Sequence, residues 1–345
     1  MAKVSIVIPT FNRYFLIEET LDSIFQQSYQ DWECIVVDDH STDDTANRVL
    51  QYVNQDPRVK LFFNERIKGA QGARNTGIAK ASGEYIIFLD SDDCLSKNCL
   101  RNRLDLAFNN PDYHYYCFST AVFNKKPYDT NLMWNYLDMP ENDLIRFVKN
   151  DNPWHTSGVL WKKDTLIYLD GWDEKLSCWQ DWDMHLRAVI DPRLKFLKST
   201  NNDIDSFYRV DEGYQSISDQ ELSKNSIQSK VYLVDKFSAL LPLTQKHVRL
   251  EFARLIYRIS IEVLKSGCKK YAVSLLHKLM RDLNFPWFYS QSWCLYLYFK
   301  YDNAGMYPDF LIRPLGLIPR IYRNRSLLDN SRTHLRAVFN AVSIK

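Results

Sequence analysis

In the first third of the chain, short hydrophobic runs alternate with longer amphipathic segments. The hydrophobic runs are rich in β-branched and aromatic residues and are bounded by turn residues, so they indicate buried strands. We predict these strands at residues 4–9, 33–38, 59–63, 84–90 and 113–119. The amphipathic segments have the length and spacing of helices, and we predict these at residues 14–27, 43–54, 70–81 and 97–108. The alternation predicts an α/β fold with a mostly parallel sheet flanked by helices.

The pattern changes further along the chain. Residues 120–150 predict a loop with a short helix near Asp143, followed by a strand at residues 157–161 and a helix at residues 181–189. From about residue 220 strand signals disappear, and Leu and Ile recur at helical spacing at residues 231–240, 248–264 and 272–279. We therefore predict two domains, residues 1–220 and residues 221–345, of which the second is mainly helical.

The net charge of +2 conceals opposite charges in the two parts of the chain. Residues 226–345 contain 19 Lys and Arg against 7 Asp and Glu, whereas residues 1–225 contain 25 against 35. An acidic part suits a cation-dependent site. A basic tail with aromatic rings, such as residues 285–289 and 311–323, suits an anionic membrane surface, although a solvated helical face explains the charge equally well.

Composition excludes several classes of protein. With 46% hydrophobic and 25% charged residues, a disordered or fibrous chain is excluded. The seven cysteines are scattered and form no CxxC pair, which argues against a disulfide framework or a zinc site and favours a reducing cytoplasm. The first residues do not resemble a signal peptide, and no apolar run is long enough to span a bilayer.

The strongest chemical signal is the run Asp90, Ser91, Asp92 and Asp93, which follows a hydrophobic strand. Ligands bind at the carboxyl ends of strands in open α/β sheets. Two unit charges about 4 Å apart repel by roughly 4 kcal/mol at an effective dielectric constant near 20, and a divalent cation removes that cost. Mg²⁺ or Mn²⁺ bound by carboxylates usually completes its shell with water and phosphate oxygens, which predicts a diphosphate substrate. A helix N-cap with an acidic first turn is the structural alternative.

Two further groups are predicted to lie at the same edge of the sheet. Asp38 and Asp39 end the second strand and suit a ribose or base contact, or they cap a loop. Small residues from Gly69 onward let the backbone approach a ligand, and Arg74 supplies a forked donor. The segment after the first strand, from Pro9 through Thr10 and Asn12, contains no glycine, which argues against a dinucleotide-binding dehydrogenase.

The third group surrounds Asp181. Its neighbours are Trp179, Gln180, Trp182 and Asp183. A carboxylate at the start of a helix between indoles suits a general base, and the rings suit sugar faces. In the alternative interpretation Asp181 caps the helix, Trp182 belongs to the core, and Asp183 pairs with Arg187.

Together these motifs resemble the family 2 inverting glycosyltransferases of the GT-A fold. The resemblance covers about residues 3–215 and rests on VSIVIPTFNR, ECIVVDDHSTDDT, GARNTGIAKASGEYIIFLDSDD, GWDE, QDWDMHLRA and the pair Tyr208 and Arg209. It implies that residues 1–220 form a catalytic domain that binds a nucleotide-diphosphate sugar, usually uridine-linked, with a divalent cation, Mn²⁺ or Mg²⁺. It further implies that one sugar is transferred per encounter, because the QxxRW motif and the membrane spans of processive synthases are absent.

The resemblance also implies roles for individual residues. The nucleotide-sugar site would be formed by Pro9, Thr10, Asn12, Asp38, Asp39, Arg74, Asp90 and Ser91. Asp92 would bind the metal, and Asp181 would be the general base. Residues expected near an acceptor are Trp179, Gln180, Trp182, Arg209 and Asp211. Relatives usually carry Glu where this chain has Gln180, and many carry His where it has Asp211.

The sequence indicates the acceptor only indirectly, through its basic tail. The basic tail suggests a lipid-linked or lipopolysaccharide acceptor at the cytoplasmic leaflet, and therefore a cytoplasmic protein peripheral to the inner face of the membrane. A module that binds nucleotide sugars without turnover is one alternative, because Gln180 departs from the pattern. A sugar nucleotidyltransferase is a weaker alternative, since it would carry a glycine-rich loop after the first strand. Nothing accompanies the basic tail that predicts nucleic-acid binding.

Overall fold

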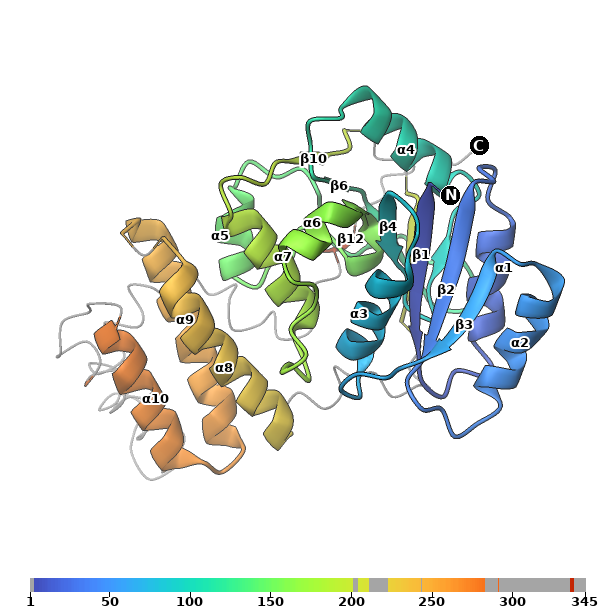
Figure 1. The fold of residues 1–345 in the computed structure, drawn as a ribbon. Helices are drawn as coiled ribbons and strands as arrows, with labels where there is room; N and C mark the ends of the chain where they lie inside the picture. The colour runs from blue at the N-terminus through green and yellow to red at the C-terminus, as the bar shows by residue number, and fades with distance from the viewer. Residues whose placement is uncertain are drawn as a thin grey trace.

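The computed structural model describes residues 3–200, 204–210, 223–242, 244–282, 291 and 336–337. Within these residues, strands form two sheets (Figure 1). The main sheet contains, in spatial order, β10 (Phe196–Lys198), β6 (Tyr115–Cys117), β9 (Val159–Lys162), β4 (Tyr85–Phe88), β1 (Val4–Thr10), β2 (Trp32–Asp38) and β3 (Val59–Phe63). The second sheet contains β12 (Arg336–Ala337), β8 (Leu132–Met133), β7 (Thr120–Phe123), β11 (Ser206–Arg209) and β5 (Cys94–Leu95).

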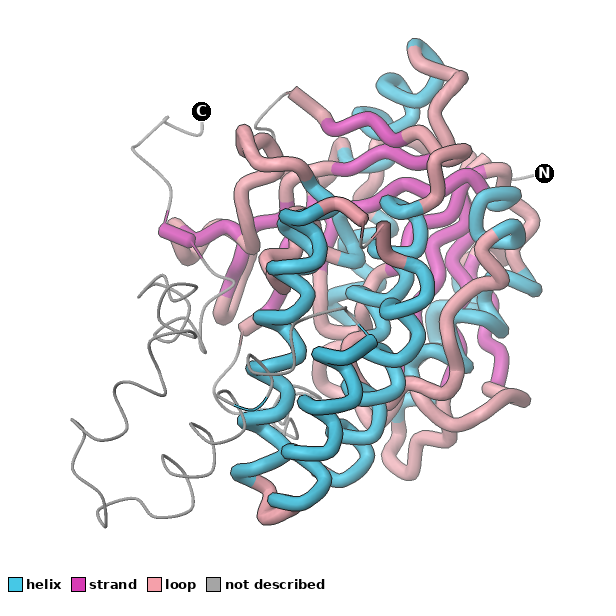
Figure 2. Tube along the Cα trace, turned by 90° about the vertical axis from the view of Figure 1, so that its left-hand side faces the viewer, coloured by secondary structure: helices cyan, strands magenta, loops and turns pink. Residues whose placement is uncertain are grey.

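Helices cover the main sheet and continue beyond it. They are α1 (Ile17–Phe25), α2 (Thr45–Gln55), α3 (Ala70–Lys80), α4 (Cys99–Asn109), α5 (Asp143–Val148), α6 (Lys163–Tyr168), α7 (Gln180–Ile190), α8 (Lys224–Leu240), α9 (Lys246–Lys265) and α10 (Lys269–Asp282), with a 3₁₀-helix at Thr156–Gly158. In Figure 2 the C-terminal helices face the viewer and most strands lie behind them.

The predicted strands and helices occur in the predicted order, with bounds that shift by several residues, but β5, α6, β10 and β11 were not predicted. Residues 120–150, predicted as loop and short helix, also contain β7 and β8, and β12 lies where we expected no strand. Strands of two to four residues are too short to show a hydrophobic period, which explains why the pattern missed them. The predicted parallel sheet is mixed on one side, because β9 runs antiparallel to both β4 and β6.

The central strands are buried on both faces. In β2, Cys34 and Val36 belong to a hydrophobic cluster shared with α1, α2 and α4, whereas Ile35 and Val37 belong to a cluster shared with α3 and α7. Alternate side chains of a strand point to opposite faces, so both kinds of position must be apolar. This explains the near-continuous hydrophobic runs from which the strands were predicted.

Helix α3 lies unusually close to the sheet. A Cβ atom at Gly77 would lie 2.2 Å from Cγ1 of Val7 in β1, so only glycine allows this approach. At the other end of the helix, the backbone N–H of Gly69 donates a hydrogen bond to Oδ2 of Asp39 (2.8 Å). The start of α3 is therefore fixed at the edge where β2 ends.

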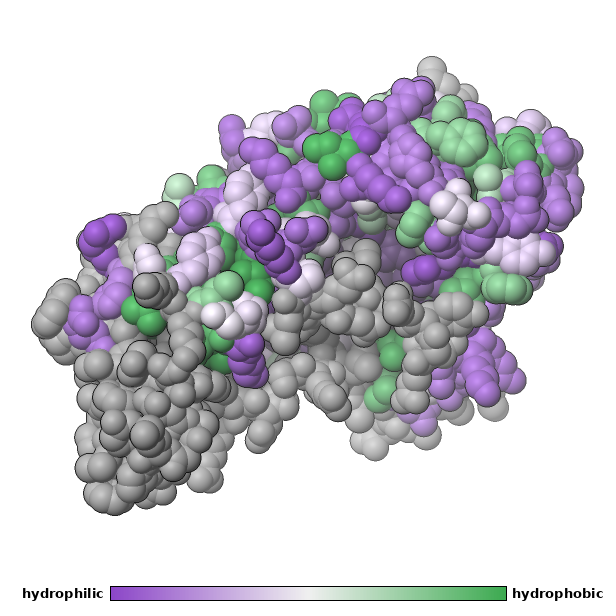
Figure 3. Space-filling model, turned by 90° about the horizontal axis from the view of Figure 1, so that it is seen from below, coloured by the Kyte–Doolittle hydropathy of each residue, from purple (hydrophilic) through white to green (hydrophobic). Residues whose placement is uncertain are grey.

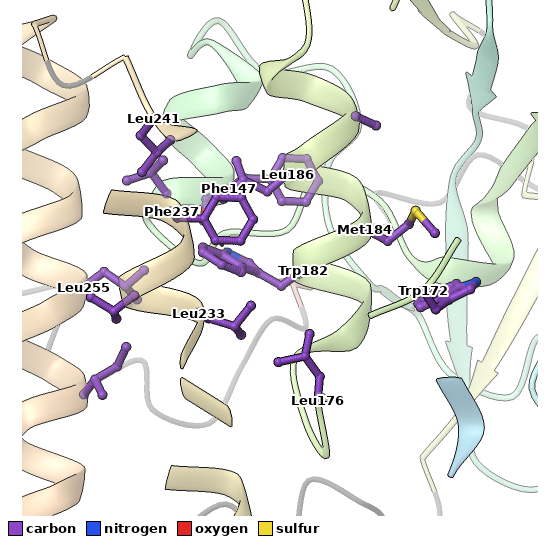
Figure 4. Close-up of a cluster of buried hydrophobic side chains, with 14 of the residues drawn as sticks. Phe147, Trp172, Leu176, Trp182, Met184, Leu186, Leu233, Phe237, Leu241 and Leu255 are labelled. Atoms are coloured by element: carbon purple, nitrogen blue, oxygen red, sulfur yellow. Dashed lines mark hydrogen bonds between the residues drawn. The ribbon is translucent and has the colours of Figure 1, made fainter. Parts of the chain in front are cut away.

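The C-terminal helices pack against α5 and α7. One hydrophobic cluster includes Phe147 of α5, Trp182 of α7, Phe237 of α8 and Leu255 of α9 (Figure 4). The helical character predicted for this region is confirmed for α8 to α10. The division into domains at residue 220 remains a prediction, and the hydrophobic cluster is continuous across it. Among the described residues, no helix is long and apolar enough to cross a membrane.

Candidate active site

The carboxyl ends of β1, β2 and β4 meet at one edge of the main sheet. Thr10 lies opposite Asp38 in the parallel register of β1 and β2, and the N–H of Asp39 donates to the carbonyl oxygen of Thr10 (2.8 Å). On the other side of β1, the N–H of Leu89 donates to the carbonyl oxygen of Val7 (3.0 Å). The prediction that the aspartate motifs share one edge is confirmed. Seen from below, which is the side of this edge, the described surface is mainly hydrophilic (Figure 3).

Asp39 is buried, and both of its carboxylate oxygens accept hydrogen bonds. Oδ1 accepts from Nδ2 of Asn64 (2.6 Å), and Oδ2 accepts from the N–H of Gly69 (2.8 Å). The side chain thus joins the end of β2 to the loop between β3 and α3. Sequence reasoning missed Asn64, which belongs to no motif. A Cβ atom at Gly72 would lie 2.1 Å from the carbonyl oxygen of Ile67, so packing within this loop explains that glycine.

The loops after β1 and β2 are also joined to each other. The N–H of Asn12 donates to Oγ of Ser41 (2.9 Å), and Oδ1 of Asn12 accepts from the N–H of Thr42 (2.8 Å). Oδ1 of Asp38 accepts from the N–H of Ser41 (2.7 Å). Pro9, predicted to line the nucleotide-sugar site, is buried where β1 approaches its end. These residues are brought together as predicted, while their contact with a ligand remains a prediction.

Arg74 connects three elements at this edge. Its Nη2 donates to Oδ1 of Asp90 (2.6 Å), its Nη1 donates to Oε1 of Gln180 (3.2 Å), and its guanidinium lies over the ring of Trp172 (4.5 Å). Burial acts to raise the pKa of Asp90, but the charges of Arg74 and His155 hold it below its ordinary value. Asp90 is therefore ionised, and one of its two carboxylate oxygens already accepts a hydrogen bond from Arg74.

The other two aspartates of the run are less well compensated. Oδ2 of Asp92 lies 3.5 Å from Nε of Arg13, and the Asp92 side chain is 30% exposed. Burial and then the charge of Asp90 raise the pKa of Asp92. Asp93 is fully buried, which raises its pKa well above the ordinary value, and the charges of Asp92 and Asp90 act in the same direction. A bound cation would relieve this accumulation of negative charge.

A possible metal site lies beside these carboxylates. Ligand atoms of Asp90, Asp93 and His155 lie within 4.8 Å of one another, and Oδ2 of Asp93 has no hydrogen-bond partner in the described part of the chain. Carboxylate oxygen and imidazole nitrogen are suitable ligands for first-row divalent metals. Sequence reasoning missed His155, which carries no local signal, and included Asp93 only as one of the three aspartates whose repulsion calls for a cation. Asp92, the predicted metal ligand, is not part of this cluster, and its role remains a prediction.

Several buried polar atoms at this edge lack a hydrogen-bond partner. Within the described part of the chain they include Thr10 Oγ1, Asp38 Oδ2, Arg74 Nε and Asp93 Oδ2. Buried polar groups in proteins are nearly always satisfied, so exceptions that gather in one place need an explanation. Their position at the ends of three parallel strands favours a polar ligand or bound water there.

Asp181 lies in the first turn of α7 and is half-buried. No hydrogen bond or ion pair of its carboxylate to the described residues is found. Burial lowers the pKa of His155, whereas the negative charges of Asp90 and Asp181 oppose that shift. Gln180, the residue before Asp181, accepts a hydrogen bond from Arg74, which also donates to Asp90, so the first turn of α7 lies beside the aspartate run. An unpaired carboxylate in such a position can accept a proton.

The neighbours of Asp181 distinguish between the alternatives for this segment. Trp182 is buried in the core, and its Nε1 donates to the carbonyl oxygen of Phe147 (2.7 Å). Asp183 pairs with Arg187 (2.8 Å). Both findings agree with the alternative in which this segment has a structural role. Its third part, that Asp181 caps the helix, is wrong: Trp179 occupies the N-cap position, and no side chain caps the helix end. An acceptor contact by Trp182 gains no support from its position in the core.

A comparison with known proteins identifies the N-terminal part. A model of the family described as Glycosyl transferase family 2 matches residues 5–165. These residues form a family 2 glycosyltransferase domain. The resemblance seen in the sequence motifs is thereby confirmed.

Curated relatives of this glycosyltransferase domain match over about 110 residues. UDP-Glc:alpha-D-GlcNAc-diphosphoundecaprenol beta-1,3-glucosyltransferase WfgD of Escherichia coli is 43% identical over 107 residues, which are 31% of this chain and 42% of that protein. GalNAc(5)-diNAcBac-PP-undecaprenol beta-1,3-glucosyltransferase of Campylobacter jejuni is 43% identical over 108 residues, which are 31% of this chain and 35% of that protein. The match thus spans less than half the length of either relative.

Solved structures show the fold. Residues 1–349 of S. aureus TarS in complex with UDP-GlcNAc superpose with a TM-score of 0.66 at 19% identity, over 89% of this chain and 93% of that chain. The mannosyltransferase PcManGT of Pyrobaculum calidifontis, in complex with GDP-Man and Mn²⁺, gives a TM-score of 0.52 at 17% identity, over 95% and 88%. The predicted GT-A fold is confirmed.

In the glycosyltransferase fold, Arg209 holds the aspartate run. Its N–H donates to Oδ1 of Asp93 (3.0 Å), its Nε donates to the carbonyl oxygen of Asp92 (2.8 Å), and its Nη2 pairs with Glu19 of α1. The side chain is only 6% exposed, so a direct acceptor contact remains a prediction without support from its position. Asp211, another predicted acceptor residue, lies outside the described residues, as do residues 285–289 and 311–323 of the basic tail.

Proposed function

We propose that the protein transfers one sugar from a nucleotide-diphosphate sugar, most simply a uridine-linked one, to an acceptor hydroxyl with inversion at the anomeric carbon. The supporting observation is the meeting of Asp39, Arg74 and the Asp90–Asp93 run at one sheet edge of a family 2 glycosyltransferase domain. Asp181, whose carboxylate has no partner among the described residues, follows Gln180, which accepts a hydrogen bond from Arg74. Catalytic activity follows from the domain and from relatives that are named glycosyltransferases.

In this proposal Asp181 is the general base. Its carboxylate takes the proton from the acceptor hydroxyl while that oxygen forms a bond to the anomeric carbon. The bond from this carbon to the diphosphate oxygen breaks on the opposite face, and its electron pair leaves with the nucleotide diphosphate. Arg74 holds Asp90 in a fixed orientation toward the donor through a charge-assisted hydrogen bond.

The residues present fit a divalent cation. Asp90, Asp93 and His155 form the cluster that would hold it, and Oδ2 of Asp93, which has no partner among the described residues, offers it a free ligand atom. Asp92 is the ligand that the sequence resemblance implies. A bound Mn²⁺ or Mg²⁺ would stabilise the negative charge that develops on the departing diphosphate.

The names of the relatives extend the proposal to the acceptor. Two curated relatives are beta-1,3-glucosyltransferases that act on sugars linked to undecaprenol diphosphate. A third is a putative teichuronic acid biosynthesis glycosyltransferase of Bacillus subtilis, 41% identical over 102 residues. We therefore place this protein in the synthesis of a cell-surface polysaccharide on a lipid-linked acceptor, on the cytoplasmic face of the membrane.

The donor is testable directly. With Mn²⁺ present, one nucleotide sugar from a panel of uridine, guanosine, cytidine and thymidine derivatives should raise the melting temperature of the full chain, because a ligand bound only to the folded state stabilises it. We expect UDP-glucose to give the largest increase, and the purified protein to release UDP from it slowly. No increase with any nucleotide sugar would reject the proposed function. Binding without any turnover would indicate a module that only binds nucleotide sugars.

The metal ligand is testable by calorimetry. Asp92→Ala should abolish the Mn²⁺-dependent part of UDP binding, whereas Asp112→Ala, which changes an exposed aspartate, should leave it intact. Asp93→Asn tests the neighbouring cluster in the same titration. If Asp92→Ala binds UDP normally with Mn²⁺ and Asp93→Asn does not, the metal assignment moves from Asp92 to the cluster with His155.

A further inference from the structure

Helix α8 contacts the segment that carries Asp181 along one face. The N–H of Ser177 donates to Oγ of Ser229 (2.9 Å), and the ring of Trp182 meets the ring of Phe237 edge to face (4.9 Å between centroids). Figure 4 shows Trp182 enclosed between Phe147 and the α8 residues Leu233 and Phe237. The α8 residues involved are spaced by four residues, as on one face of a helix. The packing therefore docks α8 directly on α7.

Two lysines of α8 add charged contacts on either side of Asp181. Nζ of Lys236 lies 2.7 Å from Oδ2 of Asp173 and 2.6 Å from Oδ1 of the fully buried Asp183. Nζ of Lys230 lies 5.2 Å from the centre of the Trp179 ring. The two lysines therefore contact Trp179, two positions before Asp181, and Asp183, two positions after it.

Gln180, the residue directly before Asp181, is held by α3 and not by α8. Nε2 of Gln180 donates to Oε1 of Gln71 in α3 (2.7 Å), and Oε1 of Gln180 accepts from Arg74 (3.2 Å). The first turn of α7 is thus fixed between α3 and α8, while the carboxylate of Asp181 keeps no partner among the described residues. A rotation of this turn would move the Asp181 carboxylate directly, because all its side chains turn with the same backbone.

We propose that α8 is a positioning element for Asp181 and that Lys236, through Asp173 and Asp183, is its principal positioning residue. This inference rests on the function proposed above. Lys236 is not a catalytic residue, since it contacts neither the aspartate run nor Asp181. It neutralises two carboxylates; without it, Arg187 would be the one cation paired with the buried Asp183 among the residues that the structure describes. The C-terminal helices thereby contribute to the geometry of transfer.

The test uses the full chain, UDP-glucose and Mn²⁺, with UDP release as the readout. Lys236→Met should lower kcat by about 10- to 100-fold, in the range that a small misplacement of a catalytic group costs, with KM for UDP-glucose changed less than twofold. Lys236→Arg, which keeps the cation, should recover most of the rate. Lys224→Met makes the same change at an exposed position of α8 and should behave as the wild type.

A double mutant separates positioning from a general loss of structure. In the Asp181→Asn background, Lys236→Met should cause no further loss of rate, because residues that act as a unit are not additive. An equal loss in both backgrounds, or an unchanged kcat in Lys236→Met, would overturn the inference. If Lys236→Met does not fold, Tyr232→Phe removes the weaker bond to Oδ2 of Asp173 (2.9 Å) and should lower kcat about two- to threefold, with the same dependence on Asp181.

Amide hydrogen exchange in α7 tests the positioning role of α8 independently of sugar transfer. The amides at residues 183–186, the first that donate within α7, should exchange faster in Lys236→Met than in the wild type, while those of α3 stay unchanged. If the wild type turns over no nucleotide sugar, the proposed function fails, and the exchange at α7 alone decides whether α8 fixes this turn. Unchanged exchange there would refute the positioning role whatever the activity.

Discussion

Replacing Asp181 by asparagine is expected to lower the rate of sugar transfer by about 10²- to 10⁴-fold, the usual contribution of a general base. The amide has the size of the carboxylate but cannot accept the proton of the acceptor hydroxyl. The fold should be unaffected, because the carboxylate makes no contact with the described residues that the substitution would break. Turnover of the donor identified by the melting panel, measured with and without acceptor, gives the rate, and the melting temperature checks the fold.

Asp164→Asn is the matched control for this substitution. Asp164 also lies in the first turn of a helix, α6, but it is exposed and distant from the aspartate motifs in the sequence. The control should retain the rate of the wild type. Near-normal transfer by Asp181→Asn would remove Asp181 from the mechanism, and with it the proposed roles of Lys236 and α8.

The second large effect is expected on stability. Arg103 of α4 and Asp205 are both buried and form a two-point ion pair, with Nε and Nη2 of the arginine 2.7 and 2.6 Å from the carboxylate oxygens. Nη1 of Arg103 also donates to the carbonyl oxygen of Ser157 (2.8 Å). Arg103→Met should lower the free energy of unfolding by about 3–5 kcal/mol, because it leaves a buried carboxylate without its counter-charge. Urea unfolding followed by circular dichroism measures this change.

Two further variants serve as a control and a rescue for Arg103→Met. Arg101→Met removes an exposed arginine from the same helix and should change the free energy of unfolding by at most about 0.5 kcal/mol. Arg103→Met combined with Asp205→Leu should regain much of the lost stability, since a buried ion pair can often be replaced by apolar side chains of similar size. An Arg103→Met protein as stable as the wild type would show that the pair is not sustained in solution.

Much of the site was predictable because its residues follow strands. A hydrophobic run ends where the chain leaves the sheet, and parallel strands deliver their carboxyl ends to one edge. Thr10, Asp39 and Asp90 could therefore be placed together from sequence alone. Arg74 could be placed near them because its helix follows the third strand. The same reasoning predicted the pair formed by Asp183 and Arg187, which depends only on helical spacing.

The residues that were missed are joined by tertiary contacts without a local signal. His155 lies in a segment with no periodic pattern, and only the fold brings it within reach of Asp93. Asn64 bonds to Asp39 across 25 positions of sequence, and Lys236 reaches Asp183 across a much longer separation. Periodicity reports which face of an element is buried, but it does not report which other element covers that face.

Two glycines of α3 are explained by packing, and only one of them belonged to a predicted ligand contact. We expected the small residues from Gly69 to Asn75 to let the backbone approach a ligand, which includes Gly72 but not Gly77. The structure shows that Gly72 accommodates the carbonyl oxygen of Ile67 and that Gly77 accommodates Val7. Both explanations require the absence of a side chain, and a single sequence does not separate them. The packing contacts suffice to explain both positions.

The hydrophobic cluster that continues across residue 220 bears on attempts to build chimeras. One such chimera would exchange α8 to α10 for helices of another protein. Here, Phe237 of α8 lies against Trp182 of α7, so a transplanted helix brings a new surface to that indole. A chimera that takes the facing side chains of α5 and α7 together with the C-terminal helices keeps the two packed surfaces matched. A chimera joined in the loop before α8 does not keep them matched.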